Sequence, residues 1–345
     1  MVKTLRIFCL AAALIAAGIL FYTKAVAPGE TRDSDVSISL PEEPLEYTSN
    51  QEVLGTAVSQ SVYGDKAAET IETVNNILYD FSAHWDNTLV DSVPGQVAAS
   101  AGLEPSVLAE EDYQVIRRAF DLAQQTEGLF DPTVGALTSV WADGEPSADQ
   151  VSWALTYTGW QEVSLSDEDM SAGIGRPGIT LDMGAVVPGM AVQAALEAYQ
   201  EADIDGGVIT MDGAAAMTGT KSEGGESFTI GLRNPMNNDG DHYAVLQADD
   251  VVICTADGES RLLNPADGYS VETDLLAVTV LSEDGFLSDA MSSILYMQGL
   301  DKALEHLDAS DYQVILVAES GEIYLSPSLR ESFTLRDTEN FRLAD

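Results

Sequence analysis

The chain has 345 residues, 45% of them hydrophobic, which is enough to bury a full core in one large domain or two small ones. Acidic residues number 57 against 15 basic residues, for a formal net charge of −42. A surface of this sign repels nucleic-acid phosphates and anionic lipid headgroups, which argues against nucleic acid as a partner. Beyond the N-terminal region the only cysteine is Cys254, so an internal disulfide and a thiolate metal cluster are both excluded there.

The N-terminal segment, residues 1–27, resembles a membrane-targeting sequence. Lys3 and Arg6 precede the uncharged run Ile7 to Thr23. This length is typical of a signal-peptide hydrophobic region or a short membrane helix, and positive charge ahead of it places the rest of the chain outside the cytoplasm. We therefore expect an uncleaved anchor or a cleaved signal peptide. The protein is then at the extracytoplasmic face of the cell membrane, which it touches only through this segment, or is secreted if the segment is cut.

Residues 28–51 are rich in Glu, Ser, Pro and Asp and read as an acidic flexible linker, followed by one domain over residues 52–345. A first strand is expected over residues 53–64. Apolar residues recur at helical spacing over Lys66–Trp85 and again over Glu111–Gln125, so both segments are predicted to be amphipathic helices packed on a core.

The centre of the chain carries a carboxylate at a predicted strand-to-helix junction. Gly178 to Leu181 reads as a strand, Asp182 and Gly184 follow, and an apolar helix is expected over Met190 to Ala202. Glycine at such a junction lets a phosphate or a cation approach bare backbone groups, but many junctions of this kind hold no ligand. Further upstream, Asp131 precedes Pro132 and is predicted to cap a helix beginning there.

The second half of the chain is dominated by predicted strands. Long helices concentrate in the first half, and this segregation predicts an α+β domain with an antiparallel sheet. Late in the chain a helix is expected over Ser288 to Met297, where Asp289 and Ser293 stand at i and i+4 and share one face. Asp289 is alternatively an acid that interacts with the dipole at the helix start. The expected strands are residues 207–211, 227–232, 243–247, 251–255, 275–281, 312–317 and 322–325.

Four stretches, in this order, resemble the signatures of the FAD:protein FMN transferase (ApbE) family. They are TEGLFDPTVGAL over Thr126–Leu137, LDMGAVVPG over Leu181–Gly189, IGLRNP over Ile230–Pro235 and SDAMSS over Ser288–Ser293. The usual family forms read roughly T-D-G-x-F-D-P-T-V-G-P-L, L-D-L-G-G-I-A-K-G, I-G-I-x-N-P and D-A-L-S-T. The resemblance runs from about Leu54 to the end. It implies the family's α+β fold, related to the T-fold, with an antiparallel sheet and packed helices in one large domain behind the N-terminal segment.

The resemblance also implies an activity, which is the Mg²⁺-dependent transfer of FMN from FAD to a Thr or Ser of an extracytoplasmic acceptor protein, with release of AMP. It implies that Mg²⁺ is held by Asp289, Ser293 and the main-chain carbonyl of Ala185. His84 is an alternative to Trp85 as the source of an aromatic ring near the flavin. The positions implied to contact FAD are Leu54, Trp85, Leu129, Phe130, Asp131, Asp182, Gly184, Pro188 and Arg261.

Several reactive positions depart from the family pattern. Pro188 replaces the family lysine, and Arg261 replaces its histidine. Arginine can grip a phosphate but cannot act as a base at neutral pH, so Asp182 and Asp257 are the remaining candidates for the catalytic base. Three hypotheses follow: a flavin transferase whose activity these changes impair, a catalytically inactive FAD-binding or scaffold member, and a chain that keeps the fold alone.

Overall fold

The computed structural model describes residues 45–53, 55–221, 225, 227–237 and 239–344. The predicted N-terminal segment, residues 28–44 of the predicted linker and the predicted flavin contact Leu54 lie outside these ranges. No helix within them is both long and apolar enough to cross a membrane. The chain divides into two units at residues 43 and 44, and the domain discussed below belongs to the second.

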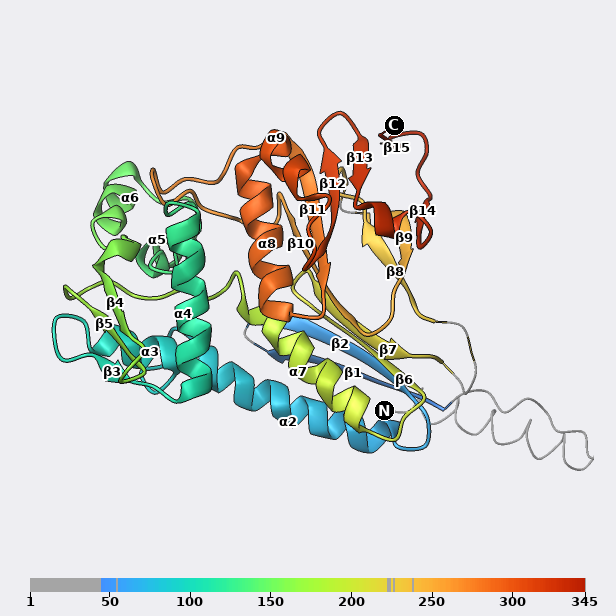
Figure 1. The fold of residues 1–345 in the computed structure, drawn as a ribbon, viewed down its shortest axis with the longest axis horizontal. Helices are drawn as coiled ribbons and strands as arrows, with labels where there is room; N and C mark the ends of the chain where they lie inside the picture. The colour runs from blue at the N-terminus through green and yellow to red at the C-terminus, as the bar shows by residue number, and fades with distance from the viewer. Residues whose placement is uncertain (1–44, 54, 222–224, 226, 238, 345) are drawn as a thin grey trace, which may run out of the picture. The chain divides into compact units, whose positions relative to one another are not determined.

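One large sheet forms the centre of the domain (Figure 1). In the described part of the chain it contains nine strands in the order β1-β2-β6-β7-β10-β11-β12-β13-β15. Every neighbouring pair is antiparallel except β13 and β15, so the predicted antiparallel α+β architecture is confirmed. The strands are β1 (Glu46–Val53), β2 (Thr56–Tyr63), β6 (Gly206–Met211), β7 (Ala214–Gly219), β10 (Val251–Asp257), β11 (Leu275–Ser282), β12 (Gln313–Ala318), β13 (Glu322–Leu325) and β15 (Arg342–Leu343).

Three helices pack on one face of this sheet: α2 (Ala67–Trp85), α7 (Val187–Glu201) and α8 (Gly285–Gln298) (Figure 1). The apolar sides of α2 and α7, including Val74, Leu78 and Val192, form one core with alternate residues of the strands, whereas the apolar side of α8 belongs to a core shared with the helical lobe described below. These helices confirm the predictions over Lys66–Trp85, Met190–Ala202 and Ser288–Met297 to within three residues at each end. The helical spacing of apolar residues therefore predicted these three helices correctly.

A second sheet of three described strands covers part of the opposite face. Its order is β14-β9-β8, with β8 (Thr229–Arg233) on the edge, β9 (His242–Gln247) in the middle and β14 (Phe333–Leu335) on the other side. Because side chains alternate along a strand, β10 sends Val252 and Cys254 toward the helices and Ile253 toward this small sheet. The main sheet is thus sandwiched between helices and a smaller sheet.

A helical lobe follows α2 in the chain and lies next to the end of α8 (Figure 1). Its main helix, α4 (Glu110–Gln125), confirms the prediction over Glu111–Gln125. The other elements are helices α3 (Val93–Ala99), α5 (Gly135–Ala142) and α6 (Ala148–Leu155), the 3₁₀ turn η1 (Trp160–Glu162), and a sheet in the order β3 (Ser106–Val107), β5 (Ser171–Ile174), β4 (Val163–Ser166). The remaining short elements of the domain are α9 (Leu300–Ala303), η2 (Leu304–His306) and η3 (Pro327–Leu329).

The secondary structure of two segments was predicted wrongly. Residues 46–51, assigned to the linker, belong to β1, because a polar, mostly exposed strand at a sheet edge has no apolar pattern to reveal it. Gly178 to Leu181 is not a strand. Its backbone instead bonds to the turn after Phe130, with Gly135 N–H donating to Thr180 O at 3.3 Å and Asp182 N–H donating to Pro132 O at 2.7 Å.

Asp131 does not cap a helix, contrary to the prediction. Helix α5 begins at Gly135, and Val134 occupies the N-cap position. Asp131 Oδ1 accepts hydrogen bonds from Thr133 N–H at 2.8 Å and Thr133 Oγ1 at 2.6 Å, while Oδ2 accepts from Trp160 N–H at 3.1 Å. The carboxylate therefore closes the turn that directly precedes α5 and links this turn to η1. Rules for helix starts consider only neighbouring residues, so they do not predict this long-range contact.

Candidate functional site

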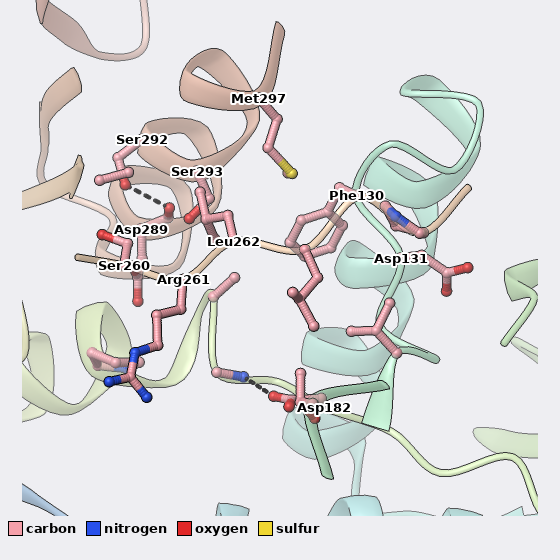
Figure 2. Close-up of a pocket in the computed structure, with 18 of the residues that line it drawn as sticks. Phe130, Asp131, Asp182, Ser260, Arg261, Leu262, Asp289, Ser292, Ser293 and Met297 are labelled. Atoms are coloured by element: carbon pink, nitrogen blue, oxygen red, sulfur yellow. Dashed lines mark hydrogen bonds between the residues drawn. The ribbon is translucent and has the colours of Figure 1, made fainter. Parts of the chain in front are cut away.

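A cavity of about 840 Å³ lies where the helical lobe meets α8 and the start of α7 (Figure 2). Cavities of roughly 300–1,000 Å³ are the usual size for small-molecule sites. One wall is largely apolar and comes from residues 129–138, and the opposite wall carries polar groups of α8 and of residues 255–265. The lining comprises Leu129, Phe130, Asp131, Pro132, Val134, Thr138, Asp182, Gly184, Ala185, Pro188, Asp212, Thr255, Ala256, Gly258, Glu259, Ser260, Arg261, Leu262, Leu263, Pro265, Asp289, Ser292, Ser293 and Met297.

Asp289 projects from the second turn of α8 and is held by the start of α7. Its Oδ2 accepts a hydrogen bond of 2.9 Å from Gly189 N–H. Glycine is required for this approach, because a Cβ on Gly189 would lie 2.1 Å from Gly285 O and 2.8 Å from Asp289 Cβ. Burial raises the pKa of Asp289 to about 7; the Gly189 hydrogen bond lowers it, and the nearby charge of Asp212 raises it further. The hydrogen bond from Gly189 therefore does not offset the effect of burial, and the negative charge of Asp289 is poorly stabilised by the protein.

Ser293 and Ala185 line the same cavity as Asp289. Ser293 is buried and stands one helical turn after Asp289, as its sequence spacing predicted. Ala185 lies in the turn that leads into α7. The three predicted metal ligands therefore face one cavity, although more than 100 residues separate Ala185 from the other two. Across the described ranges no cluster of three or more His, Cys, Asp or Glu residues is suited to a metal ion.

Asp182 lies on the lower side of the cavity in Figure 2. Its Oδ1 accepts a hydrogen bond of 2.8 Å from Gly184 N–H, which closes a tight turn of the kind that Asp favours. Asp131 is only 8% exposed, and burial raises its pKa despite the hydrogen bonds from Thr133 and Trp160. Figure 2 places Asp131 on the far side of the cavity from Asp289, where it shapes the wall.

Arg261 is the one basic side chain in the described lining of the cavity. It is exposed, and no ion pair to it is found among the residues that the structure describes. Its backbone has a φ of 49°, in the left-handed region that non-glycine residues seldom occupy. An unpaired guanidinium in a cavity, on a backbone conformation that costs energy, is suited to binding an anion.

Residues 54–316 match the sequence profile of the ApbE family. The chain belongs to the ApbE family. Among its relatives, the FAD:protein FMN transferase of Klebsiella pneumoniae strain 342 is 24% identical over 311 residues, covering 85% of this chain and 91% of the relative.

Solved structures share the fold of this ApbE-family chain. The ApbE protein of Thermotoga maritima has a TM-score of 0.73 at 24% identity and covers 84% of this chain and 99% of its own. The flavin transferase ApbE of Vibrio cholerae also has a TM-score of 0.73, at 16% identity, with the same two coverages of 84% and 99%. Likeness at these identities establishes the ApbE fold, and the observed antiparallel α+β architecture agrees with it.

Two of the positions carried over from the ApbE signatures do not line the main cavity. Trp85 is buried at the end of α2 and lines an adjoining cavity of about 460 Å³, which shares Asp182, Gly184 and Pro188 with the main one. Asp257 lines a different adjoining cavity of about 610 Å³. The nine-residue set of expected flavin contacts is therefore divided: seven line the main cavity, Trp85 lines its neighbour, and Leu54 lies outside the described ranges.

Asp257 is also strongly engaged by its surroundings. It is 8% exposed, pairs with the guanidinium of Arg233, and accepts a hydrogen bond from Glu259 N–H at 2.9 Å. A carboxylate whose oxygens are already paired is a weaker candidate for a base than Asp182, which faces the main cavity. Pro188 is the second residue of α7, where the missing N–H costs no hydrogen bond, so this departure from the family lysine is sterically compatible with the helix.

Sequence analysis missed one residue that borders all three cavities of this ApbE-family chain. Asp212 lines each of them, and with Gly213 it forms the two-residue turn between β6 and β7, with φ values of 44° and 77°. Asp-Gly is the strongest short signal for such a hairpin turn and was available in the sequence. Ser292 was missed as well; it lines the main cavity, and its hydroxyl donates to Asp289 O at 2.9 Å.

Proposed function

We propose that this chain is an FAD:protein FMN transferase. It would move FMN from FAD to a Thr or Ser hydroxyl of an acceptor protein and release AMP. The observation that carries the proposal is the convergence of Asp289, Ser293, Ala185 and Arg261 on one cavity large enough for a nucleotide. The names of relatives that match over most of their length support it.

The transfer breaks one bond of the FAD pyrophosphate. The acceptor oxygen attacks the phosphorus on the FMN side, the bond from that phosphorus to the AMP oxygen breaks, and the hydroxyl proton passes to a base. AMP leaves with the electron pair of the broken bond. Such a reaction depends mainly on alignment of the two oxygens and on neutralisation of the phosphate charge.

The donor set of the cavity fits Mg²⁺, which prefers hard oxygen ligands and completes its shell with water and substrate phosphate. Asp289 supplies a carboxylate, Ser293 a hydroxyl and Ala185 a main-chain carbonyl. The raised pKa of Asp289 indicates a carboxylate that the protein's own groups leave uncompensated, and a bound cation would supply that compensation. When bound, Mg²⁺ would neutralise pyrophosphate charge.

Other residues of the cavity would bind a phosphate, contact the flavin ring and accept the hydroxyl proton. Arg261 would grip a phosphate through paired N–H donors. Leu129 and Phe130 offer an apolar wall for a planar ring. Asp182 would accept the hydroxyl proton, since its Oδ1 closes the turn at Gly184 while no described residue hydrogen-bonds to Oδ2.

A second candidate is a catalytically inactive member that binds FAD as a reservoir or scaffold. Two observations favour it: Pro188 contributes no charge to the cavity, and Arg261 cannot serve as the base that the family histidine would be. In the first candidate these same changes slow transfer without abolishing it. We further propose an extracytoplasmic setting, with residues 1–27 as signal or anchor and an extracytoplasmic acceptor protein as partner.

One experiment tests both candidates. The full-length chain is titrated with FAD, with and without Mg²⁺, and then incubated with an acceptor domain that the Klebsiella relative modifies. A covalent fluorescent adduct together with released AMP supports the transferase. Tight, Mg²⁺-dependent FAD binding without adduct or AMP supports the reservoir, and absence of FAD binding refutes both.

A further inference from the structure

The second cavity, of about 610 Å³, lies between the main sheet and the small sheet. Its floor is one face of the main sheet, where consecutive strands present small side chains, namely Thr210, Ala215, Thr255, Ala277 and Thr279. Its rim is strand β8, represented by Ile230, Gly231, Leu232 and Arg233. Small residues on facing strands leave a groove where large ones would have filled the space.

Strand β8 is the edge of the small sheet, so one row of its backbone groups is unpaired within that sheet. The register identifies which row this is. Gln247 N–H donates to Ser332 O on the β14 side, and Ala248 N–H donates to Phe228 O on the β8 side. Because the direction alternates along a strand, Gly231, opposite Val245, turns its N–H and C=O toward the free edge. No described residue bonds to either group.

The second cavity continues into the first. Asp212, Thr255, Glu259 and Ser260 line both, and the first cavity contains Asp289. A chain lying along β8 therefore needs no further opening to reach the place where a pyrophosphate would sit. A transferase with two substrates requires such a second approach, because FAD itself occupies the first cavity.

We propose that the second cavity docks the acceptor protein: an extended acceptor segment adds as a further strand beside β8 and directs its Thr or Ser hydroxyl past Asp212 into the first cavity. Strand addition of this kind uses main-chain hydrogen bonds for affinity and side-chain pockets for specificity. The inference rests on the proposed function, since it assigns the acceptor site of that same reaction. The bonds made and broken are those of the transfer described above.

The lining indicates which segment fits. Small floor residues leave room for small side chains beside the hydroxyl. The carboxylates Asp257 and Glu259 are paired with Arg233, whereas Asp212 is exposed, and the chain's net charge is −42. Acidic residues next to the acceptor hydroxyl are therefore repelled, and small neutral ones are preferred.

The test separates docking from FAD binding. Ala215→Leu fills the floor of the second cavity, and Ala248→Leu makes the same change at a partly buried residue outside both cavities. For each variant and for the unmodified full-length chain, FAD affinity is measured by flavin fluorescence, and adduct formation is measured against acceptor concentration. We expect Ala215→Leu to raise the KM for the acceptor about tenfold, which corresponds to about 1.4 kcal/mol, with FAD affinity unchanged. Ala248→Leu should match the unmodified chain, and an unchanged acceptor KM in Ala215→Leu overturns the proposal.

A second measurement does not depend on turnover. A fluorescently labelled acceptor peptide with Ala in place of the reactive hydroxyl residue is titrated by anisotropy, alongside the same peptide N-methylated at the residues flanking that position. Methylation removes the N–H groups that a strand beside β8 would use, so we expect it to weaken binding about tenfold. If the unmodified chain binds this peptide but forms no adduct with the acceptor that keeps its hydroxyl residue, docking stands and transfer fails. If the two peptides bind equally, or neither binds, strand addition is refuted whatever the outcome for transfer.

Discussion

The main-chain N–H of Gly189 lies 2.9 Å from Oδ2 of Asp289, a residue 100 positions further along the chain. This hydrogen bond joins the first turn of α7 to the second turn of α8, next to the contact between Gly189 and Gly285. It brings the turn containing Ala185 into the same cavity as Asp289 and Ser293. The close approach of two helices is therefore what assembles the proposed metal site.

Gly189→Ala should separate these helices. Its new Cβ would lie 2.1 Å from Gly285 O, a main-chain atom that cannot move without shifting α8. We expect a loss of about 1–3 kcal/mol in the free energy of unfolding, measured by urea denaturation, together with weaker Mg²⁺-dependent FAD binding. Glu201→Ala, an exposed position at the end of the same helix, is the control and should change neither. Equal stability of Gly189→Ala and the control would contradict the packing argument.

Stability without metal should fall as pH rises from about 4 to about 7. Burial raises the folded-state pKa of Asp289 from 3.8 to about 7, so in this window the folded chain binds a proton that the unfolded chain has lost. Where the native state binds more protons, raising the pH destabilises it. Thermal unfolding without metal should show this pH-dependent loss of stability in the unmodified chain and not in Asp289→Asn.

The same residue predicts when Mg²⁺ stabilises the fold. Above pH 7 Asp289 is ionised and can bind the cation, so added Mg²⁺ should raise the Tm at pH 8 more than at pH 5. The Tm of Asp289→Asn should not respond to Mg²⁺ at either pH. A Mg²⁺-induced rise of the same size in both proteins would place the ion elsewhere.

Pro188→Lys should tighten FAD binding. The position lies in the first turn of α7, lines the main cavity and contributes no charge. A lysine there adds a cation near the proposed pyrophosphate, for which we expect a gain of about 1 kcal/mol, or about fivefold in Kd by flavin fluorescence. Pro188→Gln adds a side chain of similar reach without charge. A Gln variant that binds FAD as tightly as the Lys variant would refute the electrostatic explanation.

Arg261→Gln should weaken FAD binding through the phosphates alone. Because Arg261 is the one basic group in the described lining, its loss should cost about 2 kcal/mol, or about thirtyfold in Kd. Riboflavin, which lacks phosphate, should bind both forms equally in the same fluorescence titration. Arg330→Gln, an exposed arginine outside the cavity, is the matched control. A parallel loss for riboflavin would mean that Arg261 contacts the ring or shapes the cavity.

Asp182→Asn should reduce kcat while leaving FAD affinity unchanged. The amide oxygen of Asn can still accept the Gly184 N–H bond, so the turn is preserved, but the side chain no longer takes a proton. Loss of a general base typically costs about 10²- to 10⁴-fold in rate. Single-turnover adduct formation at saturating FAD measures the effect, and Asp80→Asn on the exposed side of α2 serves as control. A kcat within about twofold of the unmodified chain would exclude Asp182 as the base.

The sequence was informative wherever the signal is local. Apolar spacing located α2, α4, α7 and α8, and alternating patterns located most strands of the two sheets. It missed β7, because half of the run Ala214 to Gly219 is alanine and Thr218 is its one β-branched residue. The i, i+4 spacing correctly placed Asp289 and Ser293 on one face of α8 toward one cavity.

By itself, then, the sequence determined the helices, the antiparallel α+β class, the family and the face shared by Asp289 and Ser293. Only the tertiary structure showed that Gly189 reaches Asp289, that Asp212 borders three cavities, and that Arg233 pairs with Asp257 outside the main cavity. The physical reason is the separation along the sequence between the residues that interact. Helix periodicity and spacing on one face depend on neighbours a few residues away, whereas these contacts depend on strand order and on how closely two helices pack, which no short stretch of sequence encodes.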